Sequence, residues 1–260
     1  MNDKYSFLLC SCDNYSDLWD PFFTLLTRYW KGFDYEVYLC TESKKYTFPG
    51  LNIHCPLNVP QTNTWSQNLI DTLHSIPTEY IIFMLDDFWL KSPVNTERLE
   101  MLMARFDADK RMGNLLLLHQ SASSLQPSAQ YPDLVKFPAR RPYRISTQVS
   151  LYRKDYLLKV LRPHETAWRF EVFGTKRSAR LPFDNWIIAD GTPPMFDYDR
   201  GGVVYRRSYV KEFVDYFVEK EGIAVDPSRR VDRMDVLVEE YHRNHKPTLR
   251  GLIDTIRSQF

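Results

Sequence analysis

The sequence has little cysteine, no excess of charge of either sign and no basic tract. Its four cysteines, Cys10, Cys12, Cys40 and Cys55, all lie in the first quarter of the 260 residues, and the pair in CSC has no second pair at the spacing of a zinc site. We therefore predict reduced, buried thiols. Lysine and arginine number 34 against 33 acidic residues, so the formal net charge is +1. This balance argues against a polymeric nucleic acid as partner.

Long hydrophobic runs are also missing. The start, MNDKYSFLLCSCDNYSD, has one short apolar run that polar residues interrupt at once, so it predicts neither a signal peptide nor a membrane-spanning helix. We expect the protein in the cytoplasm. Hydrophobic residues still make up 43% of the chain and aromatic residues 15%, which predicts a sizeable core and suits either dense packing or a cleft that stacks on sugars.

Strand-like and helical segments alternate through the first 120 residues. Continuous apolar or alternating runs predict strands at 5–12, 35–42, 51–57, 79–85 and 114–119. Helical spacing predicts helices at 16–30, 64–76 and 95–106, the second of them capped by Thr62 or Thr64. This alternation is typical of a parallel, doubly wound α/β sheet, in which ligands bind beyond the carboxyl ends of the strands.

The second half of the chain is less regular. Residues 120–144 hold four prolines and several serines without a sustained period, so they predict a long loop beside the site. Strand pattern returns at 146–153, helical pattern at 154–161 and 165–179, and strand pattern at 201–210. The last residues, from about 231 to 260, are charged and are predicted to form a helical extension.

Two adjacent carboxylates, Asp86 and Asp87, end the apolar run YIIFML. They repel each other most strongly in a low dielectric, and a divalent cation such as Mg²⁺ or Mn²⁺ would offset that repulsion and bring in a phosphorylated substrate. Both acids can bind one ion only if the chain turns there; otherwise one binds metal and the other a nearby hydroxyl or amide. We expect Asp87 to bind the metal and Asp86 to support it. The alternative is a pair that caps a helix or faces solvent.

The segment WSQNLIDTLHSIPTEYIIFMLDDFWL resembles the central segment of GT-A glycosyltransferases. The family's Asn and its EYI-x-F run are matched by Asn68, by Glu79, Tyr80 and Ile81, and by Phe83, while Asp87 takes the place of its metal-binding Asp. Two positions depart from the pattern: Leu85 stands where the first Asp of D-x-D would be, and Gln67 stands where an Arg often precedes the Asn. The resemblance implies a GT-A (Rossmann-like) fold with a mixed, mainly parallel sheet, a Mn²⁺ or Mg²⁺ cofactor and a nucleoside-diphosphate sugar donor.

The same resemblance assigns the donor contacts. The loop after the first strand, CDNYSD, is implied to hold the base and ribose, with Asp13 accepting from uracil or ribose and Tyr15 stacking on the base. Asn68 and Asp86 are implied to complete the donor site. The alternatives are a helix-capping role for Asp13 and an ordinary surface position for Tyr15.

Enzymes of this fold that invert the anomeric centre need a carboxylate base. Glu171, in ETAWRFEVFG, is our candidate, since apolar neighbours can raise a carboxyl pKa; Glu165 is the competitor, and both could instead be ordinary helix residues. Trp168 offers a face for a sugar ring, and Gln148 is assigned to the acceptor with it. Basic residues near that helix and in the long loop could offset the charge of a leaving diphosphate; they are Arg140, Arg141, Lys176, Arg177 and Arg180.

These assignments predict one catalytic domain over residues 1–230, with a nucleotide-sugar-binding half at about 1–120 and an acceptor half at about 121–230. The predicted function is sugar transfer to a glycan, or to a lipid-linked glycan with the enzyme bound peripherally at the inner face of the membrane. A nucleotidyltransferase of similar architecture is one alternative, although CSCDNYSD has no glycine for a phosphate loop. A non-catalytic carbohydrate-binding module is the other.

Overall fold

A computed structural model describes residues 3–119, 125–192, 194–205, 207–226, 228–229 and 258. The strands are β1 (Tyr5–Cys10), β2 (Val37–Cys40), β3 (Ile53–His54), β4 (Tyr80–Leu85), β5 (Met112–Leu116), β6 (Leu134–Lys136), β7 (Ser150–Arg153), β8 (Asp184–Ile188), β9 (Val204–Tyr205) and β10 (Ser208–Tyr209). The helices are η1 (Asp13–Leu18), α1 (Trp19–Tyr29), α2 (Trp65–Ser75), α3 (Thr96–Ala108), α4 (Lys154–Val160), α5 (Ala167–Arg169), η2 (Phe170–Gly174), α6 (Thr175–Ser178) and α7 (Lys211–Glu221).

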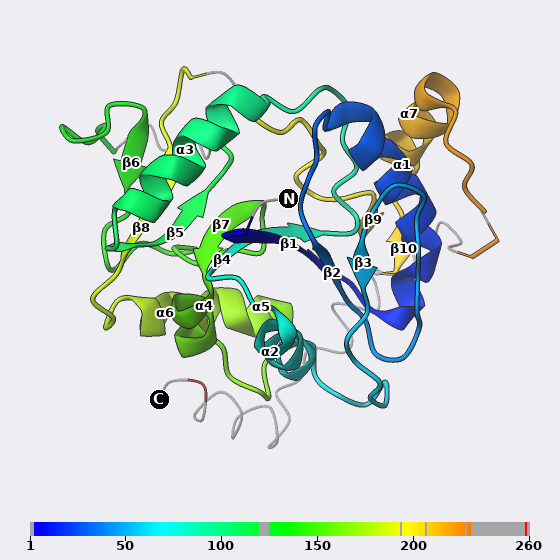
Figure 1. Cartoon of the computed structure of the whole chain (residues 1–260), viewed down its shortest axis with the longest axis horizontal. Helices are drawn as coiled ribbons and strands as arrows, with labels where there is room; N and C mark the ends of the chain where they lie inside the picture. The colour runs from blue at the N-terminus through cyan, green and yellow to red at the C-terminus, as the bar shows by residue number, and fades with distance from the viewer. Residues whose placement is uncertain are drawn as a thin grey trace, which may run out of the picture.

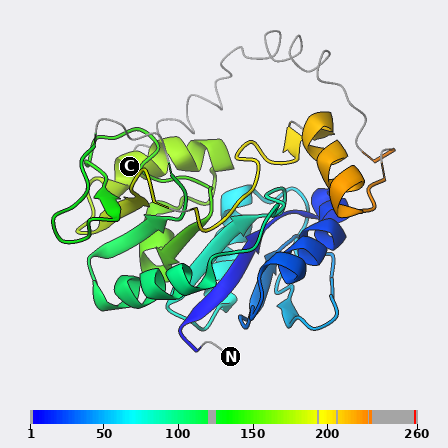
Figure 2. The same ribbon diagram turned by 90° about the horizontal axis from the view of Figure 1, so that it is seen from above.

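Eight strands form one mixed sheet in the order β3-β2-β1-β4-β7-β5-β8-β6 (Figure 1). Strands β1 to β4 run parallel to one another, β7 is antiparallel to both β4 and β5, and β8 is parallel to β5. The strands β1, β2, β4, β5 and β8 therefore all end at the same edge, which we call the carboxyl edge. Figure 2 shows helices on both faces of this sheet, which confirms the predicted GT-A class of α/β fold.

The central strands are buried on both faces, as their apolar runs predict, and alternate side chains serve two separate cores. Phe7, Leu9 and Ile82 pack with residues of α1 and α3 on one face. Leu8 and Ile81 pack with residues of α2 and α4 on the other face. This two-sided packing fixes the register of β1 and β4, and with it the position of the residues that follow each strand.

Helix α2 begins where the sequence predicts, because the Thr64 side chain accepts a hydrogen bond of 3.1 Å from the backbone N–H of Gln67. This cap places Asn68, which is buried, in the first turns of the helix. Asn95 caps α3 in the same way, accepting from the backbone N–H of Arg98 at 3.1 Å.

Part of the second half differs from the sequence prediction. The predicted loop at 120–144 contains strand β6, which pairs antiparallel with β8, and the residues 201–210 form the hairpin β9–β10 rather than a single strand. The sequence analysis assigned neither β8 nor α7, although Phe213, Val214 and Phe217 of α7 have helical spacing. The predicted extension at 231–260 lies outside the described residues, except for Ser258.

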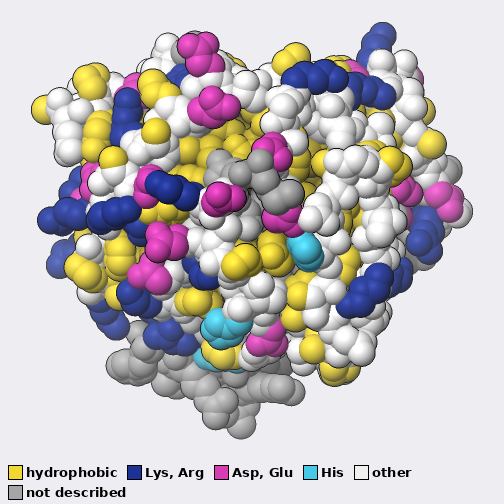
Figure 3. Space-filling model, in the orientation of Figure 1, with side chains coloured by type: hydrophobic (Ala, Val, Ile, Leu, Met, Phe, Trp, Pro, Cys, Tyr) yellow, Lys and Arg dark blue, Asp and Glu magenta, His cyan; other side chains and the backbone are white. Residues whose placement is uncertain are grey.

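None of the described helices is long and apolar enough to cross a membrane. On the face seen in Figure 3, acidic and basic side chains are intermingled, in keeping with the near-neutral charge of the chain. The four cysteines are free thiols, and Cys10 and Cys40 are buried.

Candidate active site at the carboxyl edge

The chain turns immediately after β4, which is the condition the sequence analysis set for the acidic pair. The backbone N–H of Phe88 donates to the carbonyl of Leu85 at 3.3 Å, so Asp86 and Asp87 occupy the two central positions of a tight turn at the carboxyl edge. Their side chains nevertheless go to different partners.

Asp86 faces the end of β1. Its side chain is buried and accepts a hydrogen bond from the hydroxyl of Ser11, which in turn accepts from the indole N–H of Trp19 at 2.7 Å. The indole N–H of Trp89 donates to the Asp86 carbonyl at 3.1 Å. This is the supporting arrangement, a carboxylate on a neighbouring hydroxyl, that the sequence analysis considered for one of the two acids.

Asp87 faces the segment 197–203, which we call the strap. The backbone N–H of Val203 donates to the Asp87 carbonyl at 2.9 Å, and Gly202 lies directly against the Asp87 carboxylate. A Cβ at position 202 would stand 2.5 Å from Asp87 Cγ, and the residue has a φ of +74°, which glycine adopts without strain. Only glycine therefore lets the strap approach the carboxylate so closely.

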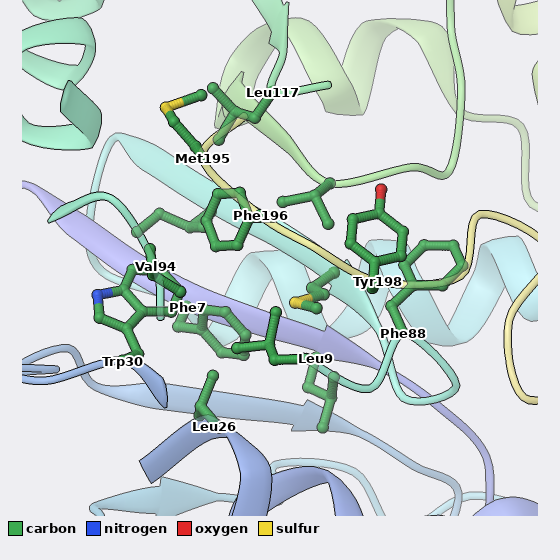
Figure 4. Close-up of a cluster of buried hydrophobic side chains, with 14 of the residues drawn as sticks. Phe7, Leu9, Leu26, Trp30, Phe88, Val94, Leu117, Met195, Phe196 and Tyr198 are labelled. Atoms are coloured by element: carbon green, nitrogen blue, oxygen red, sulfur yellow. The ribbon is translucent and has the colours of Figure 1, made fainter. Parts of the chain in front are cut away.

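Aromatic packing, which Figure 4 shows, and one lysine anchor the strap. The centre of the Tyr198 ring lies 4.6 Å from that of Phe88, the residue directly after the acidic pair. Met195 and Phe196, just before the strap, also point into the cluster of buried hydrophobic side chains in Figure 4. Lys91 donates from its backbone N–H to the Asp197 carbonyl at 2.9 Å and pairs with the Asp199 carboxylate at 2.6 Å. The strap is thus held at both the core and the surface.

Gln148, two residues before β7, completes this arrangement from within the acceptor half. Its amide N–H donates to the Arg200 carbonyl at 3.1 Å, and its amide oxygen accepts from the Tyr198 hydroxyl at 3.0 Å. Since Ser150 pairs with Phe83 across β7 and β4, the residues just before Ser150 lie at the carboxyl edge. Gln148 therefore lies beside the acidic pair, as a site residue would, and its contact with an acceptor stays a prediction.

Asp13 and Asn68 meet through a residue that the sequence analysis missed, Glu42. One Glu42 oxygen accepts from the Asp13 backbone N–H at 2.6 Å and the other from the Asn68 amide at 3.2 Å. Burial raises the pKa of Glu42. Its signal in the sequence was its place two residues after the end of β2, the same position that Asp87 holds after β4.

The Asp13 carboxylate accepts hydrogen bonds from the turn after β2. It accepts from the hydroxyl of Ser43 at 2.7 Å and from the backbone N–H groups of Glu42, Ser43 and Lys44 at 3.1 to 3.2 Å. Burial would raise the pKa of Asp13, but these hydrogen bonds outweigh it and the pKa is lowered. Direct contact of Asp13 with a base or ribose stays a prediction; in the structure its side chain shapes the loop that would surround them.

A cavity of about 320 Å³ opens beside this loop. Its wall includes Tyr15, which the sequence analysis assigned to the base, together with Asp13 and Asp17. Three cations complete the wall, and they come from separate elements: Lys44, Arg207 and Arg229. None of the three was among the basic residues that the sequence suggested, because no local pattern brings them together.

Glu171 is held at the carboxyl edge by the residues before β7. Its carboxylate accepts from the backbone N–H of Thr147 at 2.7 Å, and from the hydroxyls of Thr147 and Ser146 at 3.0 and 3.1 Å. Trp168, one turn earlier, exposes 76% of its surface, so its ring is open to a ligand. Polar donors, rather than the aromatic neighbours in sequence, surround the Glu171 carboxylate.

Glu165, the competing base, is fully buried and forms an ion pair of 2.5 Å with Arg177. Arg177 also donates to the carbonyls of Val160 and Ser258, so the charged groups of both residues have their partners inside the protein. A carboxylate so enclosed cannot reach the hydroxyl of an acceptor, and this guanidinium cannot reach a diphosphate.

The residues present suit one kind of cation. No three His, Cys, Asp or Glu side chains converge as a metal site within the described part of the chain. Asp86 bonds to Ser11, and the binding of an ion by Asp87 stays a prediction. Mg²⁺ and Mn²⁺ accept such a set, since they take one or two carboxylates and complete their shell with phosphate oxygens and water.

No family model matches the sequence, and a search of curated proteins also finds no match. Solved structures do match. Residues 1–349 of S. aureus TarS, in complex with UDP-GlcNAc, align at a TM-score of 0.51 and 14% identity over 98% of this chain and 79% of that one. The mannosyltransferase PcManGT from Pyrobaculum calidifontis, in complex with GDP-Man and Mn²⁺, aligns at 0.51 and 11% identity over 99% of this chain and 74% of that one.

The match to a longer S. aureus TarS structure spans only 36% of that chain. At these identities the shared property is the fold. The strand order, the helices on both faces and these two alignments together show that the chain has the GT-A fold of nucleotide-sugar glycosyltransferases.

Proposed function

We propose that the protein is a metal-dependent glycosyltransferase that moves a sugar from a nucleoside-diphosphate sugar to a glycan or a lipid-linked glycan. The observation that carries this proposal is the turn after β4, which presents Asp87 at the carboxyl edge of a GT-A sheet. The neighbours with this fold were solved with UDP-GlcNAc and with GDP-Man and Mn²⁺. Residues 1–120 would bind the donor and residues 121–230 the acceptor.

Asp87 is the residue we propose for Mn²⁺ or Mg²⁺, and Asp86 for holding the turn in place through Ser11. The metal, when bound, would neutralise charge on the donor diphosphate. The loop with Asp13 and Tyr15 would surround the base and ribose, and Asn68 would support that loop through Glu42.

Glu171 is the residue we propose as general base of an inverting transfer. Its position supports this role, because the donors on Thr147 and Ser146 fix its carboxylate next to Gln148, on the same edge as Asp87. A fixed carboxylate can accept the proton of an acceptor hydroxyl as that hydroxyl attacks the anomeric carbon. Trp168 and Gln148 would orient the acceptor sugar, with Trp168 stacking on its ring.

Release of nucleoside diphosphate from a panel of nucleotide sugars tests the proposal. We expect release that stops in EDTA and returns with Mn²⁺ or Mg²⁺, and that is lost in Asp87→Asn. Asp155→Asn, an exposed carboxylate on α4 that pairs with Lys159, is the matched control and should keep full activity. A nucleotidyltransferase would release pyrophosphate from a nucleoside triphosphate instead, and a binding module would release nothing; either result would refute the proposal.

A further inference from the structure

A second cavity, of about 380 Å³, opens at the edge of the sheet opposite the carboxyl edge, where β4 begins and β7 ends. We call it the amino-edge cavity. Its wall comes from four separate parts of the chain and consists of Glu79, Lys110, Arg153, Lys154, Asp155 and Phe183. Three of these six side chains are cations. Neither the sequence analysis nor the proposed function gives this cavity a role.

Arg153, the last residue of β7, contributes a buried guanidinium. Its Nε and Nη2 groups donate to the backbone carbonyls of Met112, Phe106 and Asp109 at 2.9 to 3.2 Å. Its Nη1 donates to the Tyr80 hydroxyl at 3.1 Å. Within the described part of the chain, all of its hydrogen bonds therefore go to neutral oxygens. A buried charge is costly without an opposite charge beside it, so an anion in the cavity would stabilise this guanidinium.

Two of the other charged groups of the wall already have partners. Lys110 pairs with Asp107 at 2.9 Å, and Asp155 pairs with Lys159 at 3.0 Å. Glu79 forms no ion pair within the described part of the chain. It is therefore the one carboxylate of the wall that is left to balance the remaining cations.

Lys154 is the second cation that donates to a neutral group. Its ammonium donates to the Ile76 carbonyl at 2.6 Å. Burial lowers the pKa of Lys154, and the negative charge of Glu79 offsets this only in part. Arg153 and Lys154 thus stand against one carboxylate, which leaves an excess of one positive charge in the wall.

We propose that the amino-edge cavity is a binding site for a phosphate monoester. Such a group carries a charge of about −1.5 to −2 at pH 7 and has three strong acceptor oxygens, which suits the donors of Arg153 and Lys154. A volume of about 380 Å³ is that of a small-molecule pocket rather than of a site for a bare ion. The Phe183 ring offers the rest of the ligand an apolar contact, and the Glu79 carboxylate can accept from its hydroxyls. The site is independent of the proposed function.

Calorimetry with glucose 1-phosphate, inorganic phosphate and glucose tests the site, in EDTA so that no metal brings phosphate to the carboxyl edge. We expect glucose 1-phosphate to bind most tightly and glucose not to bind. Lys154→Gln should lower the affinity for glucose 1-phosphate by roughly tenfold or more, the effect of losing one charged hydrogen bond. Lys154→Arg should keep most of the affinity. Lys31→Gln, which changes an exposed lysine outside both cavities, is the matched control and should bind as the wild type does.

Hydrogen exchange of the wild type locates the ligand without a variant. Glucose 1-phosphate should slow exchange in the segments 108–112 and 153–156, which border the amino-edge cavity. Equal affinity in Lys154→Gln and wild type, or protection confined to the carboxyl edge, would overturn the inference. Inorganic phosphate that binds as tightly as glucose 1-phosphate would overturn the assignment to an ester. A wild type that binds neither phosphate probe at millimolar concentration would reject the site altogether.

Discussion

Gly202→Ala should destabilise the protein and weaken binding at the site, because the strap packs against Asp87 at this residue. The new Cβ would stand 2.5 Å from Asp87 Cγ, in a backbone conformation of φ +74°. The backbone strain costs roughly 1–2 kcal/mol, and forcing a methyl group into an occupied space typically costs about 1–3 kcal/mol more. We therefore expect a loss of about 2–5 kcal/mol in the free energy of unfolding, together with a displaced Asp87 carboxylate.

Two other glycines separate these contributions. Gly50 has a φ of +79° with no atom within 4 Å of a built Cβ, so Gly50→Ala should show the strain alone, about 1–2 kcal/mol. Gly201, next to Gly202, would place its Cβ no closer than 3.9 Å to the Phe213 ring and has no positive φ. Gly201→Ala should therefore stay within about 0.5 kcal/mol of wild type.

The assay is thermal unfolding of the four proteins, followed by calorimetry of Mn²⁺-dependent UDP or GDP binding. In a domain of this size each kcal/mol shifts the melting temperature by about 2–4 °C, so Gly202→Ala should melt several degrees below Gly50→Ala. It alone should also weaken the metal-dependent binding. A Gly202→Ala protein as stable as Gly50→Ala, with metal-dependent binding intact, would refute the reasoning that the strap packs on Asp87.

Three further variants test the two glutamates and one thiol. Glu171→Gln should lower turnover by roughly 10²- to 10⁴-fold with donor affinity nearly unchanged. NMR of the wild-type product tests the mechanism, and a product that keeps the donor's anomeric configuration would reject inversion. Glu165→Gln should instead destabilise the fold by about 3–5 kcal/mol, because it breaks the buried pair with Arg177. Burial raises the pKa of Cys12 to about 12, so stability should fall as the pH rises above about 9, where the thiol ionises only in the unfolded chain. Urea unfolding should show a smaller fall in Cys12→Ser; an equal fall would contradict this.

The sequence by itself determined the features that depend on local pattern. The apolar run before Asp86 predicts a strand buried on both faces, and the spacing after Thr64 predicts a capped helix, because periodicity and capping are properties of neighbouring residues. Strand and helix alternation then places the acidic pair at the carboxyl edge of a parallel sheet. The resemblance to GT-A enzymes rests on the same segment, and the fold confirms it.

Only the tertiary structure decided which side chains meet. Glu165 and Glu171 are six residues apart in the chain, and packing alone buries one against Arg177 and brings the other to the residues before β7. The approach of Gly202 to Asp87 joins segments that are far apart in the chain. Contacts of this kind depend on how distant elements pack, and no local periodicity records that, so the strap and the cationic wall of the cavity had no signal in the sequence.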